Sequence, residues 1–303
     1  MPRGRRTRFC ADVSASAGEP IAATASTIEN WIVVEYRGLW ARRALGESLL
    51  SDVVKRHLRA QLRALPASRL LFVRQPSRRS RDGFAVFACR SEERAPTLNA
   101  LEIEAHDDLV ELDFTAPTLP GRPAAHPLLV VCTHGKRDPC CARYGRPLYE
   151  SLREQTDEGW VWQSSHVGGD RFAGNVVCLP EALYFGRVTR LGAVAVLAEY
   201  LAGRIDLDHY RGRSCYPFPV QAAERAVREA TGLTGIFDLA FEASERTGPD
   251  SLRVVFEAAG SRYEVDVTAE LGDLVELTCS AEVPKRPTRY VARLSGNLPA
   301  PAA

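Results

Sequence analysis

The sequence predicts an α/β protein, which becomes α+β when its C-terminal region is included. Residues 127–205 alternate short apolar runs with amphipathic stretches in the order β-α-β-β-β-α, a pattern typical of a compact α/β unit. Residues 237–281 contain successive segments of alternating apolar and polar residues, which predict an antiparallel β meander with one buried face. The proline-rich segment 116–127 precedes the α/β unit and is the best linker candidate.

Apolar periodicity predicts each element in turn. Residues 48–65 repeat apolar side chains at helical spacing and stop before Pro66. A second amphipathic helix is expected at 191–201, where Gly203 closes it. Short runs rich in β-branched and aromatic residues predict the strands. The other predicted helices are 147–155 and 220–231, and the predicted strands are 31–37, 69–75, 84–90, 109–114, 127–132, 161–165, 175–179, 183–188, 237–243, 252–258, 263–269 and 274–281.

These elements suggest four regions along the chain. The first region begins with basic residues and continues with small and polar residues, which is typical of a poorly ordered segment. The others differ in how helices and strands alternate, so we expect each to form its own part of the fold. The regions are a flexible N-terminus at 1–25, an N-terminal α/β region at 26–115, an α/β core at 127–205, and a C-terminal helix plus β meander at 206–295.

Composition and charge exclude several classes of function. The formal net charge of +1 gives no general attraction to nucleic acid or to an anionic membrane. No stretch approaches the roughly 20 apolar residues that a membrane helix needs, and the basic N-terminus lacks the apolar segment of a secretory signal. We therefore expect a cytoplasmic protein that binds neither nucleic acid nor membranes. Eight cysteines are too few for a disulfide scaffold in a chain of 303 residues, so a cluster of them indicates metal binding or redox chemistry.

Two segments carry residue types that bind transition metals. CTHGKRDPCC at 132–141 and SHVGGDRFAGN at 165–175 each follow a predicted strand. Thiolates and imidazoles at this density are what a transition metal or an iron–sulfur cluster requires. The step of nine residues from Cys132 to Cys141 is too wide for the tight knuckle of a structural zinc site and forms an open loop. The candidate ligands are Cys132, His134, Asp138, Cys140, Cys141, His166, Asp170 and Cys178.

Neighbouring residues qualify these candidates. Cys140 and Cys141 are adjacent, so in an extended segment their side chains diverge, and we expect one to face the metal and the other to pack. Gly168 and Gly169 allow backbone N–H groups to approach the sulfurs of a cluster. Arg171 either pairs with a carboxylate or tunes the cluster, and the sequence does not decide between these roles.

The remaining cysteines are interpreted as packing residues. Cys89, Cys215 and Cys279 lie apart from the two loops, and we interpret them as small packing residues. Cys178 lies in the middle of an apolar strand, where packing is also the favoured role.

The sequence contains no GxSxG elbow and no P-loop, and no Ser–His–Asp arrangement is recognisable. These absences point away from hydrolysis.

At the two loops the chain resembles the sucrase/ferredoxin-like family. Members of that family carry a CxHGxRDxCC-type loop followed by an HxGG(H/D)RFAxN loop, which read CTHGKRDPCC and HVGGDRFAGN here and precede VVCLPEALYFGRV. CADVSASAGEPIAATAS, WIVVEYRGLWARRAL and YRGRS also look like segments of bacterial members, so the resemblance covers most of the chain. Together with a preference for arginine over lysine, which GC-rich codon usage produces, it suggests an actinobacterial origin.

The resemblance implies a thioredoxin-like ferredoxin core and a [2Fe-2S] cluster held by two cysteines and two histidines. By position, Cys132 and Cys141 match the cysteines, His166 matches the first histidine, and Asp170 stands where the second histidine is expected. A carboxylate adds negative charge and should lower the reduction potential. Two alternatives stay open: another ligand replaces Asp170, or the cluster has been lost. The alternative ligands are Cys140, Cys178 and His134, and the residues expected around the cluster are Gly168, Gly169, Arg171 and Asn175.

The sequence therefore favours a soluble electron-transfer protein that exchanges electrons with a redox partner protein. We expect a redox carrier rather than a catalyst, and no acidic pair supports the sucrose cleavage that the family name suggests. A second hypothesis is a cluster-free thioredoxin-like thiol oxidoreductase, in which Arg137 lowers the pKa of Cys132 or of the Cys140–Cys141 pair. A third is a non-catalytic adaptor whose cysteines hold zinc or pack.

Overall fold

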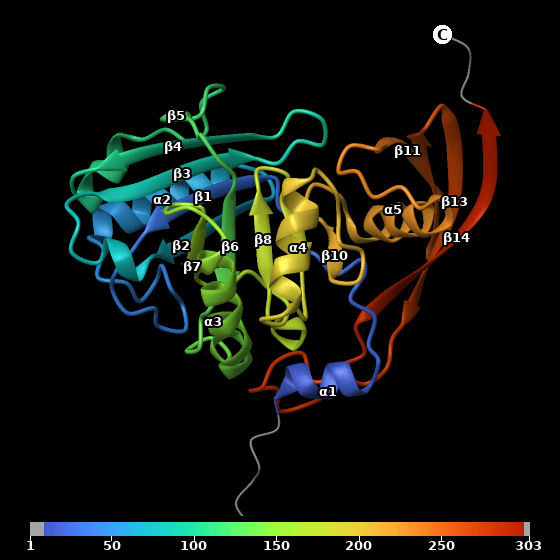
Figure 1. Ribbon diagram of the computed structural model, residues 1–303, viewed down its shortest axis with the longest axis horizontal. Helices are drawn as coiled ribbons and strands as arrows, with labels where there is room; N and C mark the ends of the chain where they lie inside the picture. The colour runs from blue at the N-terminus through green and yellow to red at the C-terminus, as the bar shows by residue number, and fades with distance from the viewer. Residues whose placement is uncertain (1–8, 300–303) are drawn as a thin grey trace, which may run out of the picture.

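The computed structural model describes residues 9–299, which form two β-sheets with helices packed against them (Figure 1). The larger sheet has ten strands in the order β10-β9-β8-β6-β7-β2-β1-β3-β4-β5, and the smaller has four strands in the order β11-β12-β13-β14. The fold is thus α/β with a C-terminal antiparallel sheet, as the sequence predicts. No helix among the described residues is long and apolar enough to cross a membrane.

The larger sheet contains two units of the same topology. In each unit the first two strands are parallel, a helix connects them, and two antiparallel strands follow on the other side of the first strand. The units meet where β2 pairs antiparallel with β7. The first comprises β1 (Asn30–Glu35), α2 (Asp52–Ala64), β2 (Ser68–Arg74), β3 (Phe84–Arg90) and β4 (Thr97–Ile103), and the second β6 (Leu128–Cys132), α3 (Pro139–Glu154), β7 (Val161–Ser164), β8 (Val176–Leu179) and β9 (Leu183–Phe185). The second unit has the strand order β7-β6-β8-β9 and carries the α/β alternation that the sequence predicts for residues 127–205.

The ten-stranded sheet curves so that its two halves face each other. The rings of Trp31 on β1 and Tyr184 on β9 lie 6.2 Å apart, although these strands are far apart in the sheet order. Phe87 on β3 and Trp162 on β7 likewise meet at 5.6 Å. These rings form a shared core between the halves, while α2, α3 and α4 (Gly192–Leu201) cover the outer surface.

The smaller sheet packs against α5 (Phe218–Thr231). Apolar residues on one face of α5 bury against alternate residues of β12 and β13, which gives the expected dry face of the meander. Its strands are β11 (Leu239–Gly248), β12 (Ser251–Ala258), β13 (Ser261–Leu271) and β14 (Thr288–Pro299). The remaining elements are α1 (Cys10–Ser16), β5 (Arg122–Pro123), β10 (Tyr210–Arg213) and the 3₁₀ helices η1 (Pro76–Arg78), η2 (His106–Glu111) and η3 (Asp170–Phe172).

Several predicted elements are wrong for identifiable reasons. The strand predicted at 109–114 is wrong, because η2 occupies His106–Glu111. The Asp108 carboxylate accepts hydrogen bonds from the Glu104 and Ala105 backbone N–H groups at the start of η2. The strand of this region is β4. The fourth meander strand is β14 rather than 274–281, which is a loop. The helix predicted at 147–155 begins at Pro139, because Asp138 caps it and proline is favoured in the first turn.

The N-terminal segment also differs from the prediction. Residues 1–8 lie outside the described part of the chain, but α1 replaces the expected flexible segment over Cys10–Ser16, and Cys10 is fully buried. The linker candidate at 116–127 contributes β5, which pairs with β4. Strands from both predicted α/β regions share one sheet, and the predicted regional boundaries stay a prediction.

A buried ion pair at the end of β1 stabilises the first unit. The fully buried Glu35 carboxylate accepts hydrogen bonds from Arg37 Nε at 2.8 Å, Arg78 Nε at 3.0 Å and the Ala85 backbone N–H at 3.0 Å. Removing one partner of such a group leaves a buried charge uncompensated.

We predict that Glu35→Ala lowers the free energy of unfolding by about 3 kcal/mol, because it leaves the Arg78 guanidinium buried and without this partner. Urea denaturation followed by circular dichroism measures the change. The control is Glu158→Ala, which breaks the exposed Arg81–Glu158 pair and should change the stability by less than about 1 kcal/mol. Equal effects of the two substitutions would contradict the role of Glu35.

Candidate metal centre

The candidate site lies where β6 and β7 end. These neighbouring strands are parallel, with Cys132 paired in register with Ser164, so the loops that follow them leave from the same edge of the sheet. The first loop returns into α3, which carries Cys141 at its third position, and the second contains His166 and leads into η3.

Helix α3 sits directly over the end of β6. A Cβ atom on Gly145 would lie 1.9 Å from the Cys132 carbonyl oxygen, so only glycine permits this approach. The close contact, at the seventh residue of α3, holds the N-terminal half of this helix against β6. It therefore places Cys141 beside Cys132.

Cys132, Cys141 and His166 form one donor group, which we call the Cys132 group. One donor atom from each lies within 4.8 Å of the other two. The two cysteines are buried, whereas 24% of the His166 side chain is exposed. This group brings together three of the four ligands that the sequence singles out.

Asp170 lies against two members of the Cys132 group. Its Oδ1 is 3.0 Å from His166 Nδ1 and accepts a hydrogen bond from Cys141 Sγ at 3.2 Å. Asp170 is not among the donors that all lie within 4.8 Å of one another. From its place at the start of η3, the Asp170 carboxylate thus contacts both a sulfur and an imidazole of the Cys132 group.

The electrostatics favour an ionised Cys132, a cationic His166 and a neutral Cys141 at this site. The neighbouring Cys141 thiol, and then His166, hold the pKa of Cys132 well below its usual value despite burial. Burial would lower the pKa of His166, but Asp170 and Cys132 raise it to about 9. Burial would raise the pKa of Asp170, but His166 keeps it below its usual range, and Cys132 raises the pKa of Cys141. Cys132 is therefore the readily ionised thiol, stabilised by a cationic imidazole.

A buried arginine from β10 fixes the second loop. Arg211 Nη1 donates hydrogen bonds to the Gly168 carbonyl at 3.1 Å and to Asn175 Oδ1 at 2.8 Å, and Asn175 Nδ2 donates to the Gly169 carbonyl at 2.9 Å. Both glycines have positive φ, and a Cβ on Gly169 would lie 2.3 Å from Arg211 Nη2. Backbone conformation thus favours glycine at both positions, and the approach of Arg211 requires it at Gly169.

Arg211 is a positioning residue that no metal-ligand pattern identifies, although it lies in the YRGRS segment that resembles the family. Its guanidinium also lies over the rings of Phe172 and Tyr184, and burial lowers its pKa to about 10. Arg171, for which two roles were open, pairs with Glu19 through a 2.7 Å contact between Nε and Oε1.

The alternative ligands named from the sequence lie elsewhere. Cys178 faces the core beneath α4, because alternation along β8 places Val177, and not Cys178, on the side of Cys132. The buried His134 places Nε2 2.9 Å from the Ala41 carbonyl and does not join the Cys132 group. The sequence predicts that one cysteine of the Cys140–Cys141 pair packs against other side chains. Cys140 instead belongs to a different donor group.

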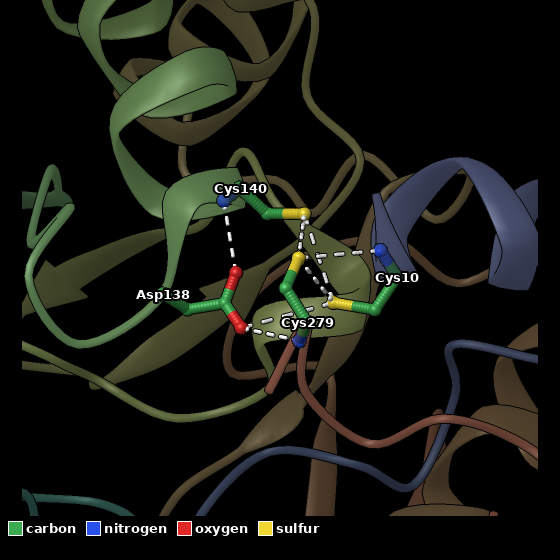
Figure 2. Close-up of side chains that lie close together, drawn as sticks. All are labelled: Cys10, Asp138, Cys140 and Cys279. Atoms are coloured by element: carbon green, nitrogen blue, oxygen red, sulfur yellow. Dashed lines mark hydrogen bonds between the residues drawn. The ribbon is translucent and has the colours of Figure 1, made fainter. Parts of the chain in front are cut away.

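This second set, which we call the Cys140 group, comprises Cys10, Asp138, Cys140 and Cys279 (Figure 2). Cys140 and Cys141 are consecutive on a helix, so their side chains point in directions about 100° apart, and each joins its own group. The sequence predicts a packing role for Cys279, and Cys10 stands out there only as part of a segment that resembles the family. Sequence separations of 130 and 139 residues from Cys140 hide both relationships.

We predict that Gly145→Ala lowers the free energy of unfolding by about 3 kcal/mol, since the new methyl group must push α3 away from the Cys132 carbonyl. Urea denaturation of the full chain measures the loss. Gly46→Ala is the matched control, because the nearest atoms to its added methyl group lie 3.8 Å away. If both variants unfold at the same urea concentration, the close contact does not hold α3 in place.

Comparisons with known proteins place the chain in a family. The sequence profile described as sucrase/ferredoxin-like matches residues 21–212, more than half of the chain. Two yeast relatives called "Altered inheritance of mitochondria protein 32" match: that of Debaryomyces hansenii is 30% identical over 95 residues, and that of Meyerozyma guilliermondii is 35% identical over 96. Each match covers 28% of this chain and about a third of the relative, 35% and 34% respectively. No solved structure matches. The chain therefore belongs to the sucrase/ferredoxin-like family.

Proposed function

We propose that this protein is an electron carrier whose [2Fe-2S] cluster is held by Cys132, Cys141, His166 and Asp170. The observation that carries the proposal is the convergence of the three donors of the Cys132 group from two separate loops. Two sulfurs and an imidazole are ligand types found in iron–sulfur proteins with mixed coordination. Asp170 supplies the remaining donor from the position where the family resemblance expects histidine.

The donors present fit such a cluster chemically. His166 Nδ1 is buried, and the Asp170 Oδ1 atom lies 3.0 Å from it. Two thiols and an imidazole that converge from separate loops are donor types that bind iron–sulfur clusters. The low pKa of Cys132 favours the thiolate that iron requires.

The cluster, when bound, supplies reversible one-electron transfer. The protein contributes position, charge and access. Arg211 and Asn175 hold the His166 loop through its carbonyl groups, so the histidine is oriented before a cluster binds. His166 is the exposed member of the group, and electrons should therefore leave toward a partner protein on that side.

The environment of the site bears on its potential and its cellular setting. A carboxylate ligand places an extra negative charge beside the cluster and lowers its reduction potential. All eight cysteines are free thiols, which suits a reducing compartment, and we propose the cytoplasm. The partner is then a redox protein rather than nucleic acid or a membrane, consistent with a formal net charge of +1.

One observation favours a second function. The thiolate of Cys132 beside a cationic His166 resembles the activated nucleophile of thiol oxidoreductases. In that case the protein would react through Cys132 without any cluster. The two functions differ in colour and composition, because only the electron carrier contains iron and sulfide.

Anaerobic purification followed by iron–sulfide reconstitution tests the electron-carrier proposal. We predict about two iron and two acid-labile sulfide per chain and a paramagnetic signal after reduction. Cys132→Ser should abolish both, whereas Cys89→Ser, which changes a buried cysteine outside both donor groups, should retain them. A colourless wild-type protein without sulfide, whose Cys132 reacts rapidly with alkylating reagents, would instead support the thiol oxidoreductase.

A second prediction concerns the fourth ligand. Asp170→His should raise the reduction potential of the reconstituted protein, because it replaces an anionic ligand with a neutral imidazole. Potentiometric titration monitored by electron paramagnetic resonance measures the change. Asp206→Asn is the matched control, since Asp206 Oδ1 lies 2.9 Å from Nδ1 of His209 outside the site. An unchanged potential and spectrum in Asp170→His would remove Asp170 from the ligand set.

A further inference from the structure

The Cys140 group joins three distant parts of the chain at the start of α3. Cys10 is the first residue of α1, Asp138 and Cys140 begin α3, and Cys279 lies in the loop between β13 and β14. Figure 2 shows the three sulfur atoms facing one another, with the Asp138 carboxylate beside them. Cys10 and Cys140 are buried, and Cys279 is half-buried. None of these residues belongs to the Cys132 group.

The sulfur atoms are spaced as ligands of one metal ion. The Sγ–Sγ distances are 3.6 Å for Cys10–Cys140, 3.2 Å for Cys140–Cys279 and 3.6 Å for Cys10–Cys279. A disulfide requires about 2.05 Å, so no pair is bonded. Tetrahedral zinc with sulfur ligands at about 2.3 Å places neighbouring sulfurs about 3.8 Å apart, close to this triangle.

Asp138 completes the set of donors and is held in place by backbone groups. Its Oδ1 accepts a hydrogen bond from the Cys140 N–H at 2.9 Å, and its Oδ2 accepts one from the Cys279 N–H at 2.7 Å. Oδ2 also lies 4.0 Å from Cys10 Sγ. Each carboxylate oxygen has a further lone pair, so these hydrogen bonds orient the group without preventing coordination.

The start of α3 favours a negative donor at Cys140. Cys140 occupies the second position of a helix of 16 residues, where the helix dipole presents partial positive charge. The Cys10 backbone N–H donates a hydrogen bond to Cys279 Sγ at 3.4 Å. Burial nevertheless raises the pKa of Cys279 to about 12, so its thiolate forms when a bound cation displaces the proton.

We propose that Cys10, Cys140 and Cys279 bind one zinc ion, with Asp138 as the fourth ligand. Binding forms three zinc–sulfur bonds and one zinc–oxygen bond, and the protons of the thiols pass to solvent. Four protein ligands leave no open position, so the site is structural rather than catalytic. The inference does not rest on the [2Fe-2S] proposal, because it uses a separate set of donors.

The ion would fasten two peripheral segments to the core. The Cys279 loop connects β13 to β14, and within it Val275 pairs with Lys285. The Cys279 backbone N–H donates a hydrogen bond to the Asp138 carboxylate. Ser280 Oγ accepts an exposed hydrogen bond from Arg42. Figure 1 shows this loop beside α1. Zinc would link both to α3 next to Cys141, and would thereby stiffen the support of the Cys132 group.

The test uses the full chain with Cys132→Ser, which removes the Cys132 group as a competing zinc site. Protein stripped of metal under reducing conditions is supplied with zinc chloride, desalted and analysed for zinc by mass spectrometry. We expect about one zinc per chain in this background. Adding Cys10→Ser or Cys279→Ser should weaken zinc binding at least tenfold in competition with a chromogenic chelator, whereas adding Cys89→Ser should leave it unchanged.

Two further measurements separate metal binding from folding. Zinc should raise the midpoint of thermal unfolding and protect the 272–287 loop from proteolysis in the Cys132→Ser background, and both effects should disappear with Cys279→Ser. Cys279 is half-buried in a loop, so this variant carries the test if Cys10→Ser fails to fold. The proposal is overturned if the background protein retains no zinc, if Cys279→Ser retains it with unchanged affinity, or if anaerobically purified protein contains a Cys140–Cys279 disulfide instead.

Discussion

The parallel pairing of β6 with β7, covered by the start of α3, is the constraint on which the candidate site depends. Parallel neighbours end at the same edge, so the loops after Cys132 and Ser164 must share that space. The absence of a side chain at Gly145 then lets α3 rest on the Cys132 carbonyl. These two backbone features bring a thiol from the helix and an imidazole from the loop to the same strand end, before any ligand contributes energy.

The beginning of α3 serves two donor groups at once. Successive helical residues point about 100° apart, so Cys141 faces β6 while Cys140 faces α1 and the Cys279 loop. Asp138, as the N-cap, stabilises the first turn and reaches the second group. A helix terminus is suited to this double role because its unpaired N–H groups and dipole favour thiolates and carboxylates on either side.

The two βαβββ units use the same strand end differently. In the first, β1 ends at Glu35, whose buried carboxylate binds two arginines and a backbone amide. In the second, β6 ends at Cys132, which neighbours soft and ionisable groups. The shared topology thus provides an equivalent position for polar side chains, and the residue types at that position separate a structural ion pair from a candidate metal centre.

Local sequence patterns determined the fold class, most strands and the two loops that carry Cys132, Cys141, His166 and Asp170, because apolar periodicity and motif spacing act within a few turns of chain. They did not predict that α3 begins at Asp138–Pro139, because proline is typical of a first helical turn and Pro147 favours a later start. Only the tertiary structure decided that the halves of the sheet face each other, that Arg211 holds the His166 loop, and that Cys10 and Cys279 meet Cys140. Those contacts join residues far apart in the chain, and their formation depends on the path of the whole backbone, which no local pattern specifies.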